Sequence, residues 1–179
     1  MLPPGSIFQW LAALFRKHEI RCLLVGGYAV AAHKIQRMTF DIDFLMTAED
    51  FAKIETELFS AGYSLLSRQK EFIQLKSNNP VQRDLDFLIA DPFTVKGLLA
   101  QGQAVTIAGE NFIIPSPLHL IAMKLHSIAE NPKRELKDLS DVIQLMRTYN
   151  INGRSDEVRE LFLKYKSIGL LDRVIQSLD

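Results

Sequence analysis

The sequence has one cysteine, Cys22, so no disulfide can form within the chain. This excludes the class of small disulfide-stapled proteins and suits a reducing compartment. No apolar run approaches the ~20 residues of a membrane-spanning helix. The first ten residues, MLPPGSIFQW, also lack the positively charged start of a signal peptide. We therefore expect a soluble, cytoplasmic protein with no membrane partner.

The sequence also lacks an excess of charge of either sign. Its 21 Lys and Arg residues balance 21 Asp and Glu residues, so no overall field favours nucleic acid or a membrane surface, although a local basic face stays open. There is no internal repeat, low-complexity tract or long linker. Because 47% of the 179 residues are hydrophobic, the chain can form one domain of typical size with an added helical part. Function must therefore be inferred from local sites.

The pattern of apolar residues changes near Ser116. Before it, short apolar runs bounded by Gly, Pro and Asn alternate with helical periodicity, and after it only helical periodicity remains. We predict an α+β fold with a small mixed sheet in a core of residues 1–115 and a C-terminal helical segment, residues 116–179, packed on that core. The expected strands lie within 21–27, 40–46, 63–77, 81–91 and 103–116, and the expected helices within 6–20, 28–35, 47–63, 92–102, 116–130, 133–149, 155–168 and 170–178.

Carboxylates stand inside two of the predicted strands, where aspartate is normally depleted. In FDIDFLM, side chains alternate between the two faces, so Asp41 and Asp43 share one face and the apolar residues the other. In RDLDFLI, Asp84 and Asp86 share the face opposite the apolar residues. Three carboxylates facing one space form a hard-oxygen site suited to Mg²⁺ or Mn²⁺. This arrangement predicts transfer chemistry on a polyphosphate.

The Gly26-Gly27 pair ends an apolar run and precedes a short predicted helix. Glycines allow close approach of backbone to phosphate, and a helix start offers free N–H groups, although such a pair taken alone is usually just a turn. Likewise, Asp41 and Asp43 alone are explained by solvation or by pairing with Arg37. The ordered combination of all these features favours a nucleotide site. We expect Arg37 to lie near phosphate or a carboxylate, and Thr39 to bond backbone or ligand.

The third carboxylate is predicted to be Asp86. Alternation cannot decide between Asp84 and Asp86, because both face the same side. Asp86 has apolar neighbours on each side, whereas Asp84 follows Arg83 and the polar loop NNPVQ. We therefore expect Asp86 to lie deeper in the sheet, opposite the D-I-D strand.

The segments LLVGGYAVAAH, RMTFDIDFLM and LDF resemble the DNA polymerase beta-like nucleotidyltransferase superfamily. RMTFDID and the tail LIAMKLHSIAENPKRELKDLSDVIQL resemble its AbiEii-type branch more specifically, and the likeness covers about residues 22–148. It implies a metal-dependent transfer of a nucleoside monophosphate from an NTP, with Mg²⁺ or Mn²⁺, and a toxin role beside an antitoxin. It assigns phosphate binding to Gly26 and Gly27, and metal binding and catalysis to Asp41, Asp43 and Asp86.

Lys124 is a lone charge in the apolar run LIAMKLH. Such a lysine either reaches to water or serves an anion, and the resemblance favours a nucleotide phosphate. Asp138 and Asp141 share one helix face. They are either a solvated face beside Arg134 and Lys137 or direct participants. The histidines show no metal-ligand spacing and are interpreted as structural.

Three functions stay open on the sequence. The leading hypothesis is an NMP transferase acting on an RNA, protein or small-molecule acceptor. The second is a catalytically silent nucleotide- or partner-binding module with the same fold, and the third is a regulatory component that works with a separate helical protein. The sequence does not identify the NTP, the acceptor or the oligomeric state.

Overall fold

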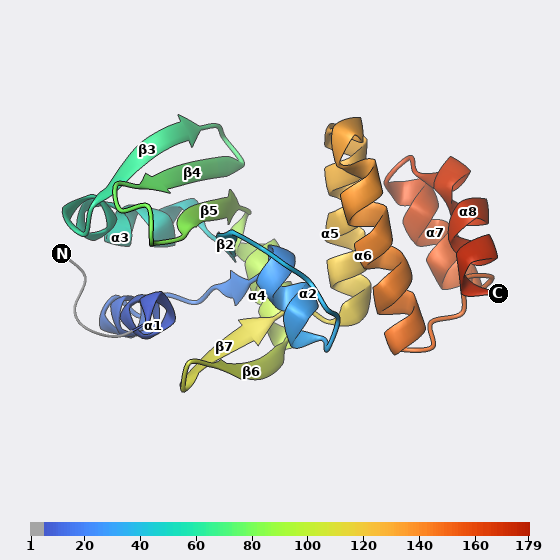
Figure 1. Ribbon diagram of the computed structural model, residues 1–179, viewed down its shortest axis with the longest axis horizontal. Helices are drawn as coiled ribbons and strands as arrows, with labels where there is room; N and C mark the ends of the chain where they lie inside the picture. Colours follow the sequence, from blue (N-terminus) through green and yellow to red (C-terminus); the bar gives the residue numbers. More distant parts are fainter. Residues whose placement is uncertain (1–5) are drawn as a thin grey trace. The chain divides into compact units, whose positions relative to one another are not determined.

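The computed structural model describes residues 6–179, which divide into two units. The sheet unit contains Arg37–Ser116 and the described residues before His33. The helical unit contains His33–Gln36 and Pro117–Asp179. The prediction about a signal peptide rests partly on residues 1–5, which lie outside the described residues. Figure 1 shows the elements of both units, with labels used below.

The sheet unit is built on a five-stranded mixed sheet with the strand order β1-β2-β5-β4-β3. β2 and β5 run parallel, and the other neighbours are antiparallel. Parallel pairing sets Asp43 directly beside Asp86 and Asp41 beside Asp84. The strands are β1 (Leu23–Leu24), β2 (Asp41–Met46), β3 (Tyr63–Arg68), β4 (Phe72–Ser77) and β5 (Asp84–Ile89).

The helices of the sheet unit begin where the sequence supplies caps. The Ser6 hydroxyl accepts from the Gln9 amide and the Gln9 side chain accepts from the Ser6 amide, which starts α1. Thr47 caps α3 by accepting from the Asp50 amide at 3.1 Å. The elements are α1 (Ile7–Lys17), α2 (Gly26–Ala32), α3 (Ala48–Ser60), α4 (Pro92–Ala100) and the separate hairpin β6 (Gln103–Ile107) and β7 (Glu110–Ile114).

The core of the sheet unit lies on the face of β2 and β5 that carries no carboxylate. Ile42, Phe44, Leu85 and Phe87 are fully buried there, as the alternation predicts. The Phe44 and Phe87 rings stack across the parallel pair with centroids 6.1 Å apart. Burial of these side chains fixes the strand register, since a slip by one residue would move every carboxylate to the core face.

The helical unit consists of α5 (Pro117–Glu130), a short 3₁₀ turn (Pro132–Arg134), α6 (Glu135–Thr148), α7 (Asp156–Lys164) and α8 (Ile168–Leu178). Val142, Leu145 and Phe162 are fully buried in it. The segment 33–36 belongs to this unit although it lies early in the chain. Its His33 Nδ1 lies 2.6 Å from the Tyr149 hydroxyl, which fits the structural role expected for this histidine.

The predicted α+β class and mixed sheet are confirmed. The helix expected over 28–35 starts earlier, at Gly26, because the glycine pair forms its first turn instead of preceding it. Within residues 6–179, every helix is too short or too polar to cross a membrane.

Candidate active site

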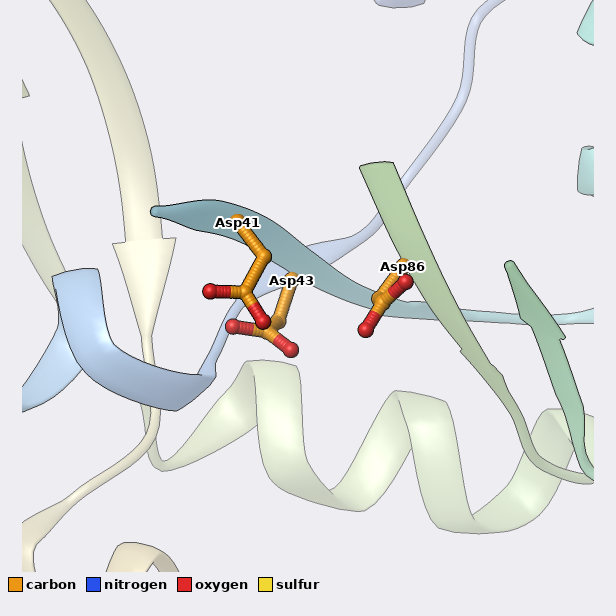
Figure 2. A group of neighbouring side chains, drawn as sticks. All are labelled: Asp41, Asp43 and Asp86. Atoms are coloured by element: carbon orange, nitrogen blue, oxygen red, sulfur yellow. The ribbon is translucent and has the colours of Figure 1, made fainter. Parts of the chain in front are cut away.

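Three carboxylates converge on the face of the sheet opposite the apolar core. Asp41 and Asp43 project from β2, and Asp86 projects from β5 toward them (Figure 2). One oxygen of each lies within 4.8 Å of an oxygen of the other two. The strands therefore bring together the three aspartates chosen from the sequence, in an arrangement that can hold a metal ion.

Asp86 is the most buried of the three, with 8% of its surface exposed. Its two oxygens each lie 3.3 Å from the Gln74 amide nitrogen on β4. Burial raises the pKa of Asp86 to about 7, and the charges of Asp43 and Asp41 add to this effect, while the Gln74 hydrogen bond opposes it. Three ionised carboxylates are thus costly together, and either a proton or a cation relieves the repulsion.

Gln74 is a site contact that the sequence analysis missed. It is the polar residue between Ile73 and Leu75, which are both buried in β4. A lone amide between two apolar residues of a predicted strand is the only signal of it in the sequence. Because pairing of β4 with β5 sets Gln74 opposite Asp86, its position depended on a strand order that the sequence did not reveal.

Asp84 has different partners from the three clustered aspartates. Its Oδ1 accepts from the Ser77 amide at 2.9 Å, and its Oδ2 lies 3.5 Å from Lys76 Nζ. Both partners belong to the end of β4. The Asp84 carboxylate thus joins β5 to β4 at the sheet margin, and the structure places it outside the group of three.

The glycine pair lies directly against the acidic strand. Gly26 has a φ of +60°, and a Cβ at this position would stand 1.9 Å from Asp43 Oδ2. A Cβ on Gly27 would stand 2.6 Å from Thr39 Cβ. Both glycines are therefore required by close packing of the first turn of α2, and Gly26 also by its left-handed backbone. The first turn of α2 and the Asp43 carboxylate border the same space.

The loop before β2 supports Asp41. Thr39 Oγ1 lies 3.2 Å from the Asp41 carbonyl oxygen and 3.3 Å from its Oδ1, which also accepts from the Phe40 amide at 3.2 Å. These contacts orient the carboxylate. Arg37 Nη1 donates to the Met38 carbonyl oxygen at 2.6 Å.

Lys124 occupies a buried ionic cluster inside the helical unit. Its Nζ lies 2.7 Å from Asp141 Oδ2 and 3.0 Å from Asp138 Oδ1, and Arg134 Nε donates to the other Asp138 oxygen at 2.8 Å. Although burial opposes it, the hydrogen bond from Arg134 and the charge of Lys124 hold the pKa of Asp138 below its usual value. The interpretation of Asp138 and Asp141 as a solvated face is wrong, because they are 0% and 4% exposed. The anions that Lys124 contacts are thus two of the protein's own carboxylates.

The fold resembles those of solved antibiotic-modifying enzymes. The solution structure of the antibiotic-resistance factor ANT(2'')-Ia has a TM-score of 0.67 at 16% identity, covering 93% of each chain. A crystal structure of ANT(2'')-Ia with adenylyl-2''-tobramycin gives 0.66 at 17% identity, covering 90% of this chain and 95% of that one. Lincomycin-bound LnuA, a lincosamide antibiotic adenylyltransferase, gives 0.57 at 16% identity, covering 79% and 96%. At these identities the likeness establishes the nucleotidyltransferase fold.

A comparison with curated protein sequences found no match. The nucleotidyltransferase resemblance noted in the sequence is confirmed at the level of the family, whereas nothing identifies the AbiEii branch. The sequence pattern of a family described as "Uncharacterised nucleotidyltransferase" matches residues 6–176, which is nearly the whole chain. The chain therefore belongs to this nucleotidyltransferase family.

Proposed function

We propose that this protein transfers a nucleoside monophosphate from an NTP to an acceptor hydroxyl in a metal-dependent reaction. The observation that carries the proposal is the convergence of Asp41, Asp43 and Asp86 on one face of the sheet, beside a glycine turn. Family membership supports the reaction class. The rest of the site is assigned on the contacts described above.

The carboxylates fit a hard divalent cation. Each of the three offers an oxygen at mutual distances within 4.8 Å. Burial and then the charges of the neighbouring carboxylates raise the pKa of Asp86, and positive charge entering the cluster relieves the repulsion between these carboxylates. We assign Asp41, Asp43 and Asp86 as the ligands of Mg²⁺ or Mn²⁺. When bound, such an ion polarises phosphate oxygens and lowers the pKa of an attacking hydroxyl.

The chain's own groups complete the reaction. In the transfer, a bond forms between the acceptor oxygen and the α-phosphorus, the bond to the pyrophosphate oxygen breaks, and the hydroxyl proton leaves to a base. We assign the proton to an Asp86 oxygen, because this carboxylate faces the same space as Asp41 and Asp43 and is the most buried of the three. Gly26 and Gly27 are assigned to the triphosphate, since their missing side chains leave backbone exposed beside Asp43.

Arg37, Thr39 and Lys124 complete the proposed nucleotide contacts. Thr39 orients the Asp41 carboxylate, and Arg37 carries a planar guanidinium suited to phosphate. Lys124 can meet a phosphate only by sharing its ammonium with Asp138 and Asp141. Arg37→Ala should weaken NTP binding with the fold unchanged, and equal NTP affinity and equal transfer in that variant would make Arg37 an ordinary surface residue.

The acceptor we favour is a small hydroxylated molecule. The structures with adenylyl-2''-tobramycin and with lincomycin match this chain over most of both lengths, and the ligands named with them are small molecules. An RNA or protein acceptor, with a toxin role and an antitoxin partner, is the alternative that the AbiEii-like segments suggest. Separate assays on small-molecule, RNA and protein acceptors distinguish them.

The decisive experiment measures transfer from each α-labelled NTP in the presence of Mg²⁺, with pyrophosphate release as a second readout. Wild type should label an acceptor, and Asp41→Asn and Asp86→Asn should abolish transfer while remaining folded. Asp84→Asn is the matched control on the same strand and should keep most of the activity. If Asp84→Asn is inactive and Asp86→Asn active, the assignment of the third carboxylate is wrong.

A catalytically silent binding module is the rival function. Calorimetry separates the two, because a transferase site needs the metal to hold the triphosphate beside three carboxylates. NTP binding that is independent of Mg²⁺ and survives Asp41→Asn would favour the silent module. Absence of any NTP binding, with or without metal, would contradict the transferase and a nucleotide-binding module, and would leave a partner-binding module. A regulatory component would instead co-purify with a helical protein.

A further inference from the structure

A cavity of about 1070 Å³ lies in the sheet unit, and none of the three clustered aspartates lines it. Its walls come from α1, the chain that enters β1, the start of α3, α4 and β7. Thr47 and Pro92, which line it, follow the carboxyl ends of β2 and β5. Thr47 lies four residue steps along the extended chain from Asp43, or about 13 Å. The cavity is therefore distinct from the candidate active site.

The cavity wall is mainly apolar. Phe15, Val95 and Phe112 contribute to it and are each less than 7% exposed, and Leu99 adds a further aliphatic side chain from α4. Cavities of ~300–1,000 Å³ lined in this way are typical of small-molecule sites, and the crevice beyond the carboxyl ends of parallel strands is a recurrent place for them. The ligand that fits such a wall has an apolar body.

The charged groups at the cavity do not balance once their ion pairs are taken into account. Arg16 pairs with Glu110, and Asp50 pairs with Lys53. Arg21, Lys96 and Glu19 also line the cavity, and none of them has an ion-pair or hydrogen-bonding side-chain partner within residues 6–179. Two unpaired cations face one unpaired anion, so the surplus is positive.

We propose that this cavity binds an amphipathic anion, an apolar chain or ring with a single carboxylate or comparable negative group. The apolar body lies against Phe15, Val95 and Leu99, and the anionic end meets Arg21 and Lys96. The surplus positive charge repels a cationic ligand. A neutral ligand of the same shape gains the apolar contacts alone.

The test uses anilinonaphthalene sulfonate, a fluorescent apolar ring system with one negative charge, on the full chain. We expect saturable binding of the probe with one site per chain. Octanoate, octanol and octyltrimethylammonium should each displace it, and the cation octyltrimethylammonium should be the weakest competitor. In the variant Arg21→Gln/Lys96→Gln, the octanoate affinity should fall about tenfold and the octanol affinity should not change. The matched control, Lys70→Gln/Lys133→Gln, removes two exposed lysines outside the cavity and should leave both affinities as in wild type.

Location is tested by filling the cavity. Leu99→Trp should weaken the binding of both octanoate and octanol. If this variant loses its circular dichroism signal, Ala100→Trp replaces it, because Ala100 is an exposed residue of the same wall. Unchanged affinity in a folded tryptophan variant would overturn the proposal, as would no saturable probe binding. A loss of octanol affinity equal to that of octanoate in Arg21→Gln/Lys96→Gln would overturn it as well. Transfer activity is not a readout, so failure here leaves the proposed reaction untouched.

Discussion

Asp86→Asn should make this protein more stable at alkaline pH, although it removes a residue assigned to the active site. The ordinary pKa of an aspartate is 3.8, and that of Asp86 is raised to about 7, mainly by burial and then by the charge of Asp43. The folded protein therefore holds a proton that the unfolded chain has already lost. Stability contributed by this proton is fully present below about pH 4 and is lost as pH rises through about 7.

The size of the effect follows from the shift. A difference of about three pH units corresponds to at most ~4 kcal/mol of unfolding free energy. Since Asp41 and Asp43 are half-buried and screened by water, we expect about half of this, ~2 kcal/mol. Asparagine copies the protonated acid in shape and cannot ionise. The variant should match wild type near pH 4 and exceed it by ~2 kcal/mol near pH 8.

Urea unfolding of both proteins across this pH range, with a chelator present, measures the difference. Comparing the two proteins cancels the titration of all other groups. Asp84→Asn is the control on the same strand, because its carboxylate lies outside the group of three and its charge raises the pKa of Asp86 less than those of Asp43 and Asp41 do. Saturating Mg²⁺ should stabilise wild type near pH 8 more than Asp86→Asn. Equal stability of Asp86→Asn and wild type at every pH would refute the electrostatic account of the cluster.

Three further substitutions test the packing at individual positions of the two units. Gly26→Ala should destabilise the protein by ~2 kcal/mol or more in urea unfolding and weaken Mg²⁺ binding, because its Cβ would overlap the Asp43 carboxylate. Gly62→Ala, where φ is +98° but no atom lies within 4 Å of the Cβ, should cost only the backbone strain of ~1 kcal/mol. Lys124→Met should cost ~3–5 kcal/mol in the same assay, because it leaves two buried carboxylates without their shared partner, and a loss below ~1 kcal/mol would contradict that role.

Most of the sheet and of the acidic site was predictable from local patterns. Alternation in FDIDFLM and LDF assigns the carboxylates and the aromatic core to opposite faces without knowledge of the strand order. Caps at Ser6 and Thr47 mark helix starts for the same local reason. The choice of Asp86 over Asp84 followed from apolar flanking residues, which are also a local signal.

The features that sequence could not supply depend on long-range pairing. Gln74 reaches Asp86 only because β4 lies beside β5 and not beside β2. The Lys124 cluster joins side chains 14 and 17 residues apart on two helices, so helical spacing within one element says nothing about it. The close fit of Gly26 against Asp43 likewise requires the actual approach of two elements, which a glycine in the sequence suggests but does not locate.

Because residues 33–36 belong to the helical unit, truncation or recombination of the gene has consequences for both units. Four residues between the glycine turn and Arg37 are held by a unit whose remaining residues begin at Pro117, with His33 2% exposed and bonded to Tyr149. A gene truncated after codon 116 would encode a chain in which His33 has lost this partner. Recombination that exchanges only the last third of the gene would pair helices from another protein with residues 33–36 of this one. Folded variants of this chain should therefore arise by point substitution within both units more readily than by exchange of one.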